Sequence, residues 1–281
     1  MTKALMIQGT SSGSGKTTLV TALCRIFVNS GYKVAPFKSQ NMSSYSYKGD
    51  GFEISRAQAI QAIAARAEIN PNMNPILLKP LGNYNSEVLL KGKFYKKMYA
   101  KEYYKKFALS TGLKTATESL DWLQKKYDLI IIEGAGSPAE FNLVEYDIAN
   151  MRMAEYSNAP VILISDIDKG GSFASIVGTL ELLEKKYQKF IKGFVINKFR
   201  GDMDILRPSF YKLRQKTGKP VLGTIPFMKF DIPDEDSLST NPKQVIIWNK
   251  KFMQCLDKKI ENLSHIVKSS LNMKAIGDLI K

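Results

Sequence analysis

Histidine and cysteine are almost missing from this chain of 281 residues. His265 is the single histidine, and Cys24 and Cys255 are the two cysteines. His265 lies in a lysine-rich stretch far from any candidate nucleophile, which argues against a Ser/His/Asp triad and against a histidine-rich zinc centre. Two cysteines leave no disulfide framework and no cysteine-based metal site.

Long apolar runs are missing too. The longest are strand-length pieces such as residues 160–164, far short of the roughly 18 residues that a membrane-spanning helix needs. Met1 leads into a short polar stretch without the pattern of a signal peptide. With 44% hydrophobic and 24% charged residues, the chain is typical of globular proteins. We therefore expect a cytoplasmic protein that does not enter the membrane.

Positive charge is concentrated in two segments. The formal net charge is +15, and residues 91–106 hold seven lysines against Glu102, while residues 241–281 hold eight lysines against three acidic residues. Such surfaces attract polyanions: nucleic acid, acidic lipid, or a small substrate rich in carboxylates or phosphates. Solvated lysine-rich helices are the simpler alternative.

Strand and helix patterns alternate along most of the chain. Apolar runs without polar alternation, such as LIII and VILI, favour strands covered on both faces, and strands separated by helices indicate βαβ units. We predict an α/β fold with a doubly wound, mostly parallel sheet. The predicted strands cover 4–8, 33–38, 76–79, 87–90, 129–133, 161–166, 193–197 and 221–225, and the predicted helices cover 17–29, 53–68, 115–126, 173–187 and 208–217.

The pattern changes after Pro233. We predict one domain over 1–233, a linker over 234–244 and a basic tail of one or two amphipathic helices over 245–281.

A phosphate-binding loop is the strongest local signal. The segment GTSSGSGKTT, residues 9–18, follows a predicted strand and precedes a predicted helix, as a P-loop requires. The first glycine of the usual pattern is replaced by Thr10, with Gly9 one position earlier. Backbone N–H groups and the helix N-terminus would bind phosphates, and Lys16 would reach the β- and γ-phosphates. The predicted nucleotide-binding residues are Gly13, Ser14, Gly15, Lys16, Thr17 and Thr18.

Acidic residues follow neighbouring predicted strands, where they could meet a Mg²⁺ ion beside the nucleotide. Glu133 ends the strand LIIIE and is the better candidate, and Thr17 would add a hydroxyl. Asp50, in a Gly-Asp-Gly loop, is either the second carboxylate or a plain turn residue. Asp166 and Asp168 end another strand. Asn197 ends the strand FVIN, where its amide would bind adenine or simply cap the strand.

These residues indicate that a nucleoside triphosphate is bound and split, without indicating for what purpose. From Leu5 to about Leu238, however, the chain resembles the synthetase domain of the cobyric acid synthases, in the wider group that includes dethiobiotin synthetase. The matching segments, in order over some 230 residues, are QGTSSGSGKTTLV, VAPFKSQNM, GDGFEISRAQAIQA, NPILLKP, EGAGSPAEFNL, DIANM, DIDKGGSFASIVGTL, GFVINKFRGD and TGKPVLGTIPF.

The resemblance implies a P-loop synthetase that uses ATP and Mg²⁺ to activate carboxylates of a corrinoid polycarboxylate and convert them to amides, those labelled b, d, e and g in the family. It implies that Lys16, Lys38 and Glu133 are catalytic, and that Thr17, Asp50 and Glu133 organise Mg²⁺. It also places Gly170, Gly171 and Ser172 at the substrate and Asn197 at adenine. A polycarboxylate substrate would explain the basic surface without nucleic acid.

The family continues into a glutaminase domain with a nucleophilic cysteine and a histidine, and this segment is not recognised here. Cys255 and His265 lie in helical sequence without a glycine-rich turn, so the glutaminase roles are not transferred to them. Ammonia would come from a separate glutaminase subunit or from solution, or else the full activity has been lost. Segment 91–106 is a candidate docking site for such a subunit, and a homodimer is left open.

Two other hypotheses share the P-loop. A ParA- or MinD-like ATPase switch would carry a second lysine early in the loop, where this chain has Ser11. A small-substrate ligase of the dethiobiotin synthetase type shares the loop and EGAG, but it does not account for SPAEFNL and DIANM. A nucleic-acid-binding role rests on charge alone.

Overall fold

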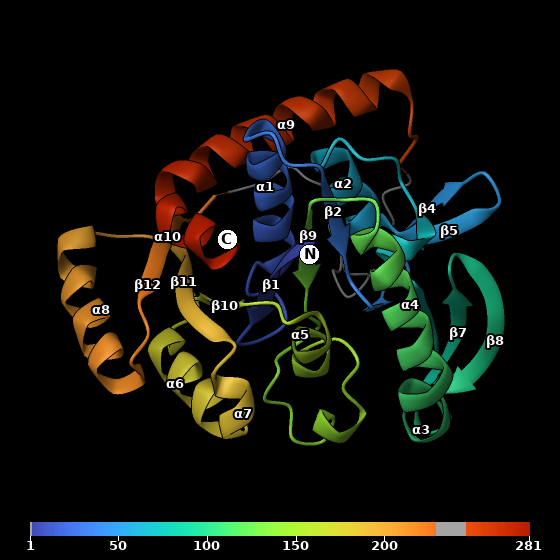
Figure 1. Ribbon diagram of the computed structural model, residues 1–281, viewed down its shortest axis with the longest axis horizontal. Helices are drawn as coiled ribbons and strands as arrows, with labels where there is room; N and C mark the ends of the chain where they lie inside the picture. The colour runs from blue at the N-terminus through green and yellow to red at the C-terminus, as the bar shows by residue number, and fades with distance from the viewer. Residues whose placement is uncertain (1, 229–245) are drawn as a thin grey trace.

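A six-stranded parallel sheet forms the centre of the computed structural model, which describes residues 2–228 and 246–281 (Figure 1). All five strand pairings are parallel, which confirms the predicted α/β fold. Across the sheet the order is β12 (Val221–Pro226), β11 (Ile191–Phe199), β10 (Val161–Asp166), β1 (Lys3–Gly9), β9 (Leu129–Glu133) and β2 (Val34–Phe37).

The central strands are apolar on both faces because helices cover both faces. In β1, Leu5 and Ile7 point into one core while Ala4 and Met6 point into the other. One face carries α1 (Lys16–Asn29), α2 (Arg56–Ala64), α9 (Lys250–Ser270) and α10 (Met273–Leu279). The other carries α4 (Leu113–Gln124), α5 (Met151–Ser157), α6 (Ser172–Leu182), α7 (Lys185–Gln188) and α8 (Met203–Thr217). No helix in these described parts has the length and apolar character to cross a membrane.

A second sheet lies beside the central one (Figure 1). Its strands, in spatial order, are β3 (Gln40–Met42), β6 (Ile76–Gly82), β7 (Asn85–Leu90) and β8 (Lys93–Tyr99). The predicted strands at 76–79 and 87–90 belong here and pair antiparallel. The physical reason is the tight turns: Asn83 and Tyr84 join β6 to β7, and Lys91 and Gly92 join β7 to β8. All four residues have positive φ, which suits two-residue hairpins.

Shorter elements connect the two sheets. A hairpin of β4 (Ser46–Gly49) and β5 (Phe52–Ser55) precedes α2. The predicted helix over 53–68 was therefore too long at its start: Ser55 ends β5, and its side chain accepts the N–H of Ala57 as the N-cap of α2. The remaining short helical segments are η1 (Pro71–Met73), α3 (Ala100–Glu102), η2 (Tyr103–Gly112) and η3 (Val144–Tyr146).

The basic segments take two different structures. In 91–106 the lysines lie on edge strand β8 and the helical turns after it, not on a single solvated helix. The predicted amphipathic helices of 245–281 are present as α9 and α10, whereas the predicted linker 234–244 lies outside the described residues. Helix α9 runs across the top of Figure 1 over α1, and it buries Leu256, Ile260 and Leu263 in the same core.

Arg25 joins three helices at this contact. It lies on α1 with a fully buried side chain, donates to the carbonyls of Ile63 and Ala64 at the end of α2, and pairs with Asp257 and Glu261 on α9. The hydrogen bond from Arg25 lowers the pKa of Glu261. Because the pKa of Glu261 is lower in the folded than in the unfolded chain, its ionised carboxylate stabilises the fold at a pH above the unfolded-state pKa. This stabilisation is lost as the pH falls through the folded-state pKa.

We expect Arg25→Met to lower the free energy of unfolding by about 2 kcal/mol, because it removes the donor to the buried carbonyl of Ala64 and breaks the ion pairs to two partly exposed carboxylates. Thermal or urea unfolding measures the change. Arg214→Met, on the exposed end of α8, is the matched control and should change stability by less than about 0.5 kcal/mol. Equal small effects of both variants would show that the Arg25 contacts are not needed for stability.

Candidate active site

The loops that follow the central strands meet at one edge of the sheet. The P-loop follows β1, the Gly-Ala-Gly segment follows β9, and Lys38 follows β2. Because β9 and β2 lie on one side of β1 while β10 and β11 lie on the other, the site has two halves. A ligand bound at the carboxyl ends of parallel strands would contact both halves.

The P-loop has the geometry of an anion-binding loop. Gly15 has φ of 102° just before α1 begins at Lys16, so the helix N-terminus faces the loop. A Cβ on Gly9 would lie 2.2 Å from Ser14 Oγ and 2.9 Å from Lys16 Nζ. A side chain at position 9 would therefore displace the Ser14 hydroxyl and the Lys16 ammonium from their places in the loop. The Ser14 hydroxyl is buried without a hydrogen-bond partner among the described residues, as expected for a group that binds a ligand.

Lys16 bridges the two loops next to β1. Its ammonium donates to Ser11 O at 3.0 Å in the P-loop and to Gly136 O at 2.9 Å in the segment after β9. Phosphate oxygens would offer stronger acceptors than these carbonyls, because a hydrogen bond between two charged groups is roughly twice as strong. Lys16 lies in the P-loop, and its predicted contact with the β- and γ-phosphates stays a prediction.

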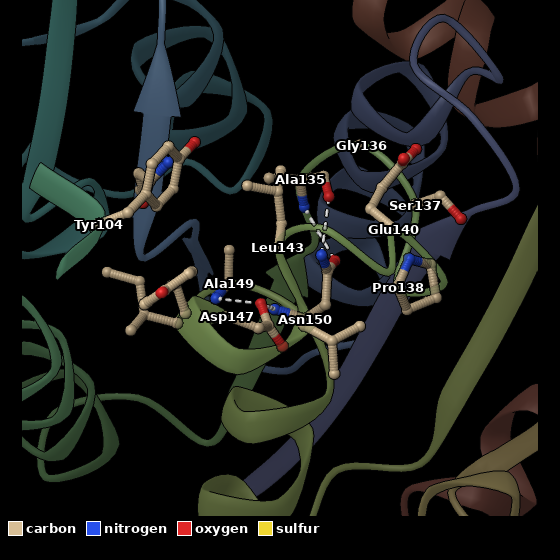
Figure 2. A pocket seen from close by; sticks show the side chains of 14 residues that line it. Tyr104, Ala135, Gly136, Ser137, Pro138, Glu140, Leu143, Asp147, Ala149 and Asn150 are labelled. Atoms are coloured by element: carbon tan, nitrogen blue, oxygen red, sulfur yellow. Dashed lines mark hydrogen bonds between the residues drawn. The ribbon is translucent and has the colours of Figure 1, made fainter. Parts of the chain in front are cut away.

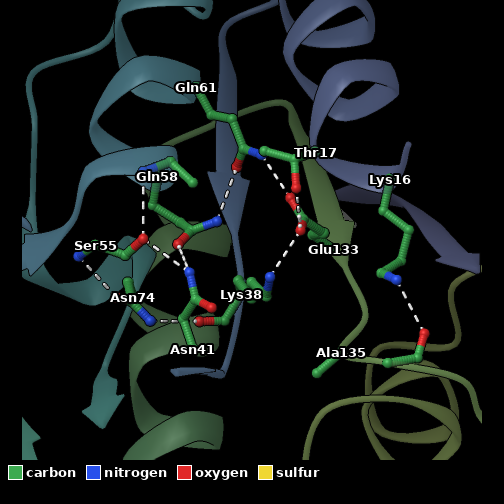
Figure 3. Close-up of polar contacts among 12 residues, drawn as sticks. Lys16, Thr17, Lys38, Asn41, Ser55, Gln58, Gln61, Asn74, Glu133 and Ala135 are labelled. Carbon is green, nitrogen blue, oxygen red and sulfur yellow. Dashed lines mark hydrogen bonds and ion pairs between the residues drawn. The ribbon is translucent and has the colours of Figure 1, made fainter. Parts of the chain in front are cut away.

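Glu133 collects donors from three elements (Figure 3). Its side chain is 0% exposed. Oε1 accepts from Thr17 Oγ1 at 2.9 Å and from Lys38 Nζ at 2.8 Å, and Oε2 accepts from Gln61 Nε2 at 2.5 Å. A carboxylate without solvent keeps its charge only when it is paired and hydrogen-bonded. Glu133, Thr17 and Lys38, three residues predicted to act together, are in direct contact.

Sequence reasoning missed a line of buried amides that leads to Glu133. Gln61 Oε1 accepts from Gln58 Nε2 at 3.3 Å, and Gln58 Oε1 accepts from Asn41 Nδ2 at 2.9 Å. Asn41 Nδ2 also donates to Ser55 Oγ at 2.7 Å. These residues come from β3, the end of β5 and α2 (Figure 3). The available signal was polar residues at spacing three, Gln58 and Gln61, on a helix that after Arg56 is otherwise alanine and isoleucine.

The other half of the site is built on β10 and β11. Asn197 is 7% exposed and donates to Ser14 O at 2.8 Å, so it holds the P-loop; its predicted contact with adenine stays a prediction. Lys198 donates to Gly13 O at 2.9 Å and pairs with Asp166 at 2.7 Å. Asp168 pairs with Arg200.

Two sets of predicted residues lie away from the Glu133 contacts. Asp50 is exposed on the turn between β4 and β5, and none of the contacts of Thr17 and Glu133 given above involves it. Gly170, Gly171 and Ser172 lie at the start of α6, where Ser172 Oγ donates to Ser165 Oγ, on the β10 side of the P-loop. Their roles in metal and substrate binding stay predictions.

A pocket opens on the β9 side of the site (Figure 2). It is lined by the segment after β9, including Gly136 whose carbonyl contacts Lys16, by residues 143–150, and by Tyr104 from η2. Asn150 shapes its wall, since its side chain accepts from Ala135 N at 3.0 Å and donates to Ala135 O at 2.8 Å. The pocket therefore adjoins the loop that holds Lys16.

The donor set fits Mg²⁺ held together with a nucleotide. No group of three His, Cys, Asp or Glu side chains in the described ranges could hold a metal ion without other ligands. Mg²⁺ usually takes one or two protein oxygens and completes its shell with phosphates and water. Thr17 Oγ1 and Glu133 Oε1 supply hard oxygens at the mouth of the P-loop.

The cysteines take no part in this chemistry. Burial on α1, and then the charge of Glu133, raise the pKa of the Cys24 thiol, which keeps it neutral and unreactive. Cys255 is exposed on α9, and His265 on the same helix lies 3.4 Å from Glu261.

Comparisons with known proteins give one family model and several relatives. The family model for the CobQ/CobB/MinD/ParA nucleotide binding domain matches residues 5–237. A probable cobyric acid synthase of Thermococcus kodakarensis is 54% identical over 246 residues, which cover 86% of this chain and 50% of the relative. The cobyric acid synthase of Thermodesulfovibrio yellowstonii is 54% identical over 241 residues, 85% of this chain and 48% of the relative. The cobyric acid synthase of Caldanaerobacter subterraneus subsp. tengcongensis is 50% identical over 267 residues, which cover 95% of this chain and 51% of the relative. The chain thus spans about half the length of these relatives.

The geometry predicts different outcomes for the two candidate metal carboxylates. We expect Glu133→Gln to weaken Mg²⁺-dependent ADP binding by about 10-fold or more, because it removes the charge beside Thr17. Asp50→Asn should change it by less than about 2-fold, because Asp50 is exposed on a hairpin turn. Calorimetric titration with ADP at several Mg²⁺ concentrations measures both. A comparable loss in Asp50→Asn would instead place Asp50 at the metal, as the sequence indicated.

Proposed function

Because this chain belongs to the CobQ/CobB/MinD/ParA nucleotide binding domain family, we propose that it binds MgATP and uses it to amidate carboxylates of a corrinoid. The observation that carries the proposal is the meeting of the P-loop with Lys38 and the buried Glu133. The names of the relatives, at 50–54% identity, supply the corrinoid and the amide product.

A carboxylate is a poor electrophile because oxide would have to leave. In the proposed reaction a carboxylate oxygen attacks the γ-phosphorus of ATP, and ADP leaves. Ammonia then attacks the carbonyl carbon of the acyl phosphate and loses a proton to water, and phosphate leaves with the original carboxylate oxygen. Each of the two steps has a better leaving group than direct amidation would have.

The residues of the site suit this reaction. Lys16 would follow the γ-phosphoryl group, and Lys38 would lower the charge repulsion between phosphate and attacking carboxylate. Thr17 and Glu133 would hold Mg²⁺, which when bound neutralises phosphate charge and polarises the phosphoryl group. The interior position of Lys38, whose side chain is 6% exposed, strengthens its field because water screens it little.

The pocket beside Gly136 is the proposed entry for the corrinoid side chain. It lies on the same side of β1 as Lys38, and its wall touches the segment that binds Lys16. Tyr104 and Leu143 offer apolar contact for the edge of a large ring. The residues at the start of α6, Gly170, Gly171 and Ser172, would contact the substrate from the β10 side. They lie close to the P-loop, because Ser165 accepts from both Ser172 and Thr10, the latter at 3.0 Å.

The basic segment 91–106 is the proposed docking surface for a glutaminase that supplies ammonia. On edge strand β8, Lys96 and Lys97 have side chains 55% and 60% exposed. Phe94 and Tyr99 are exposed at 62% and 61%. Lysines around exposed aromatics suit a partner with an acidic, partly apolar face.

The enzyme assignment is tested with MgATP, cobyrinic acid a,c-diamide and either ammonium chloride or glutamine, followed by mass spectrometry. We expect amides with ammonium and none with glutamine alone. Carboxylate labelled with oxygen-18 should transfer label to phosphate. Lys16→Ala is the control and should reduce the rate by about 10²-fold or more. Intact substrate and intact ATP in both arms would contradict the assignment, and ATP use without amides would favour a switch ATPase.

The docking surface is tested by adding the unmatched half of the Thermococcus kodakarensis relative as a separate polypeptide. With this polypeptide added, we expect free glutamine to serve as the ammonia source for amidation. In a variant in which Lys93, Lys96, Lys97 and Lys101 are each replaced by Gln, the rate with free glutamine should fall by about 10-fold, while the rate with ammonium should be unchanged. In the control variant, four lysines away from β8 are replaced by Gln: Lys185, Lys186, Lys189 and Lys192. If the two variants had equal rates with free glutamine as the ammonia source, β8 would be ruled out as the docking surface.

A further inference from the structure

The two oxygens of Glu133 have different partners (Figure 3). Oε1 contacts Thr17 at the start of α1 and Lys38 after β2, the side of Glu133 on which the P-loop lies. Oε2 contacts Gln61 on α2, at 2.5 Å. The carboxylate plane is thereby fixed, with one oxygen toward the reaction and the other toward the protein interior.

The amides behind Gln61 are oriented in one direction. A carboxylate only accepts hydrogen bonds, so Gln61 must turn its NH₂ group toward Glu133 and its oxygen away. That oxygen accepts from Gln58 Nε2, and the Gln58 oxygen accepts from Asn41 Nδ2. Each amide therefore donates toward Glu133, and their dipoles add in the direction that stabilises its negative charge.

The far end of this line is anchored to the backbone. Asn41 lies on β3 and donates to Ser55, which caps α2. Asn74 accepts from Ser55 N at 3.0 Å and donates to Lys38 O at 3.2 Å. Gln58, Gln61 and Ser55 are 0% exposed, so water offers no easy replacement for a lost partner.

We propose that Gln61 is a positioning residue that holds Glu133 for Mg²⁺–nucleotide binding, with Gln58 and Asn41 orienting Gln61 in turn. This inference rests on the proposed function in one respect, which is that Glu133 helps to hold Mg²⁺. Groups that orient a metal-binding side chain typically contribute 10- to 100-fold to metal affinity or activity. Without the Gln61 donor, Oε2 would lose a hydrogen bond in the interior, and the orientation of the carboxylate would be less restricted.

The test compares ADP binding with Mg²⁺ and with EDTA, by calorimetry, in the parent and in four variants. Gln61→Met keeps the chain length and loses the donor, and Gln61→Asn keeps an amide that is too short to reach Oε2. We expect both to weaken ADP binding by about 10-fold in Mg²⁺ and by less than about 2-fold in EDTA. Gln58→Met should have a smaller effect of the same kind. Ser264→Ala, on α9 and hydrogen-bonded to Glu261 O, controls for the loss of a buried polar group and should change neither value.

A kinetic comparison adds a second readout. In ATP turnover, Gln61→Met should lower kcat/KM for MgATP by about 10-fold or more. An equal loss of ADP affinity with and without Mg²⁺, or no loss in either Gln61 variant, would overturn the inference. The ADP measurements need no corrinoid, so a parent that binds MgADP but forms no amide would contradict the proposed function and leave this inference standing.

Discussion

The buried charge of Glu133 is the constraint around which the site is organised. A carboxylate with no exposed surface costs several kcal/mol unless cationic and polar partners compensate for its lost hydration. Lys38 supplies the charge, and Thr17 and Gln61 supply hydrogen bonds. Each partner comes from a different element, so the folded arrangement of β2, α1 and α2 is a condition for an ionised Glu133.

Sheet topology explains how these partners meet. The strand order places β9 between β1 and β2, so the residue that ends β9 lies between the P-loop and Lys38. Helix α2 packs on the same face as α1 and turns Gln61 toward that point. Arg25 then ties the end of α2 to α1 and α9. Helix α9 thus supports, through α1 and α2, the elements that surround Glu133.

Local patterns in the sequence were sufficient for the P-loop and for Glu133, because strand, glycine turn and helix are short-range signals and a carboxylate that ends a buried strand is conspicuous. Lys38 became a candidate through family resemblance. Gln61 and Asn41 could not be predicted, because a glutamine inside an alanine-rich helix looks like a surface residue until its tertiary partners are known. Asp50 shows a different case: a Gly-Asp-Gly segment is compatible with a ligand loop or a hairpin turn, and its place on the turn between β4 and β5 leaves its role at the metal a prediction.

The same limits apply to the second sheet. Two of its four strands, 76–79 and 87–90, were predicted from their apolar residues, and the positive φ of the turn residues Asn83 and Tyr84 suits the hairpin that makes them antiparallel neighbours instead of further βα units. Through β3 and Asn41, this sheet is connected to Glu133, whereas the P-loop is held from the other side by Asn197 and Lys198. The two halves of the site therefore rest on separate supports. The two supports meet at Glu133, which accepts from Thr17 at the start of α1 and from Gln61 of the amide line, so a change in the second sheet would act on the start of α1 through this carboxylate.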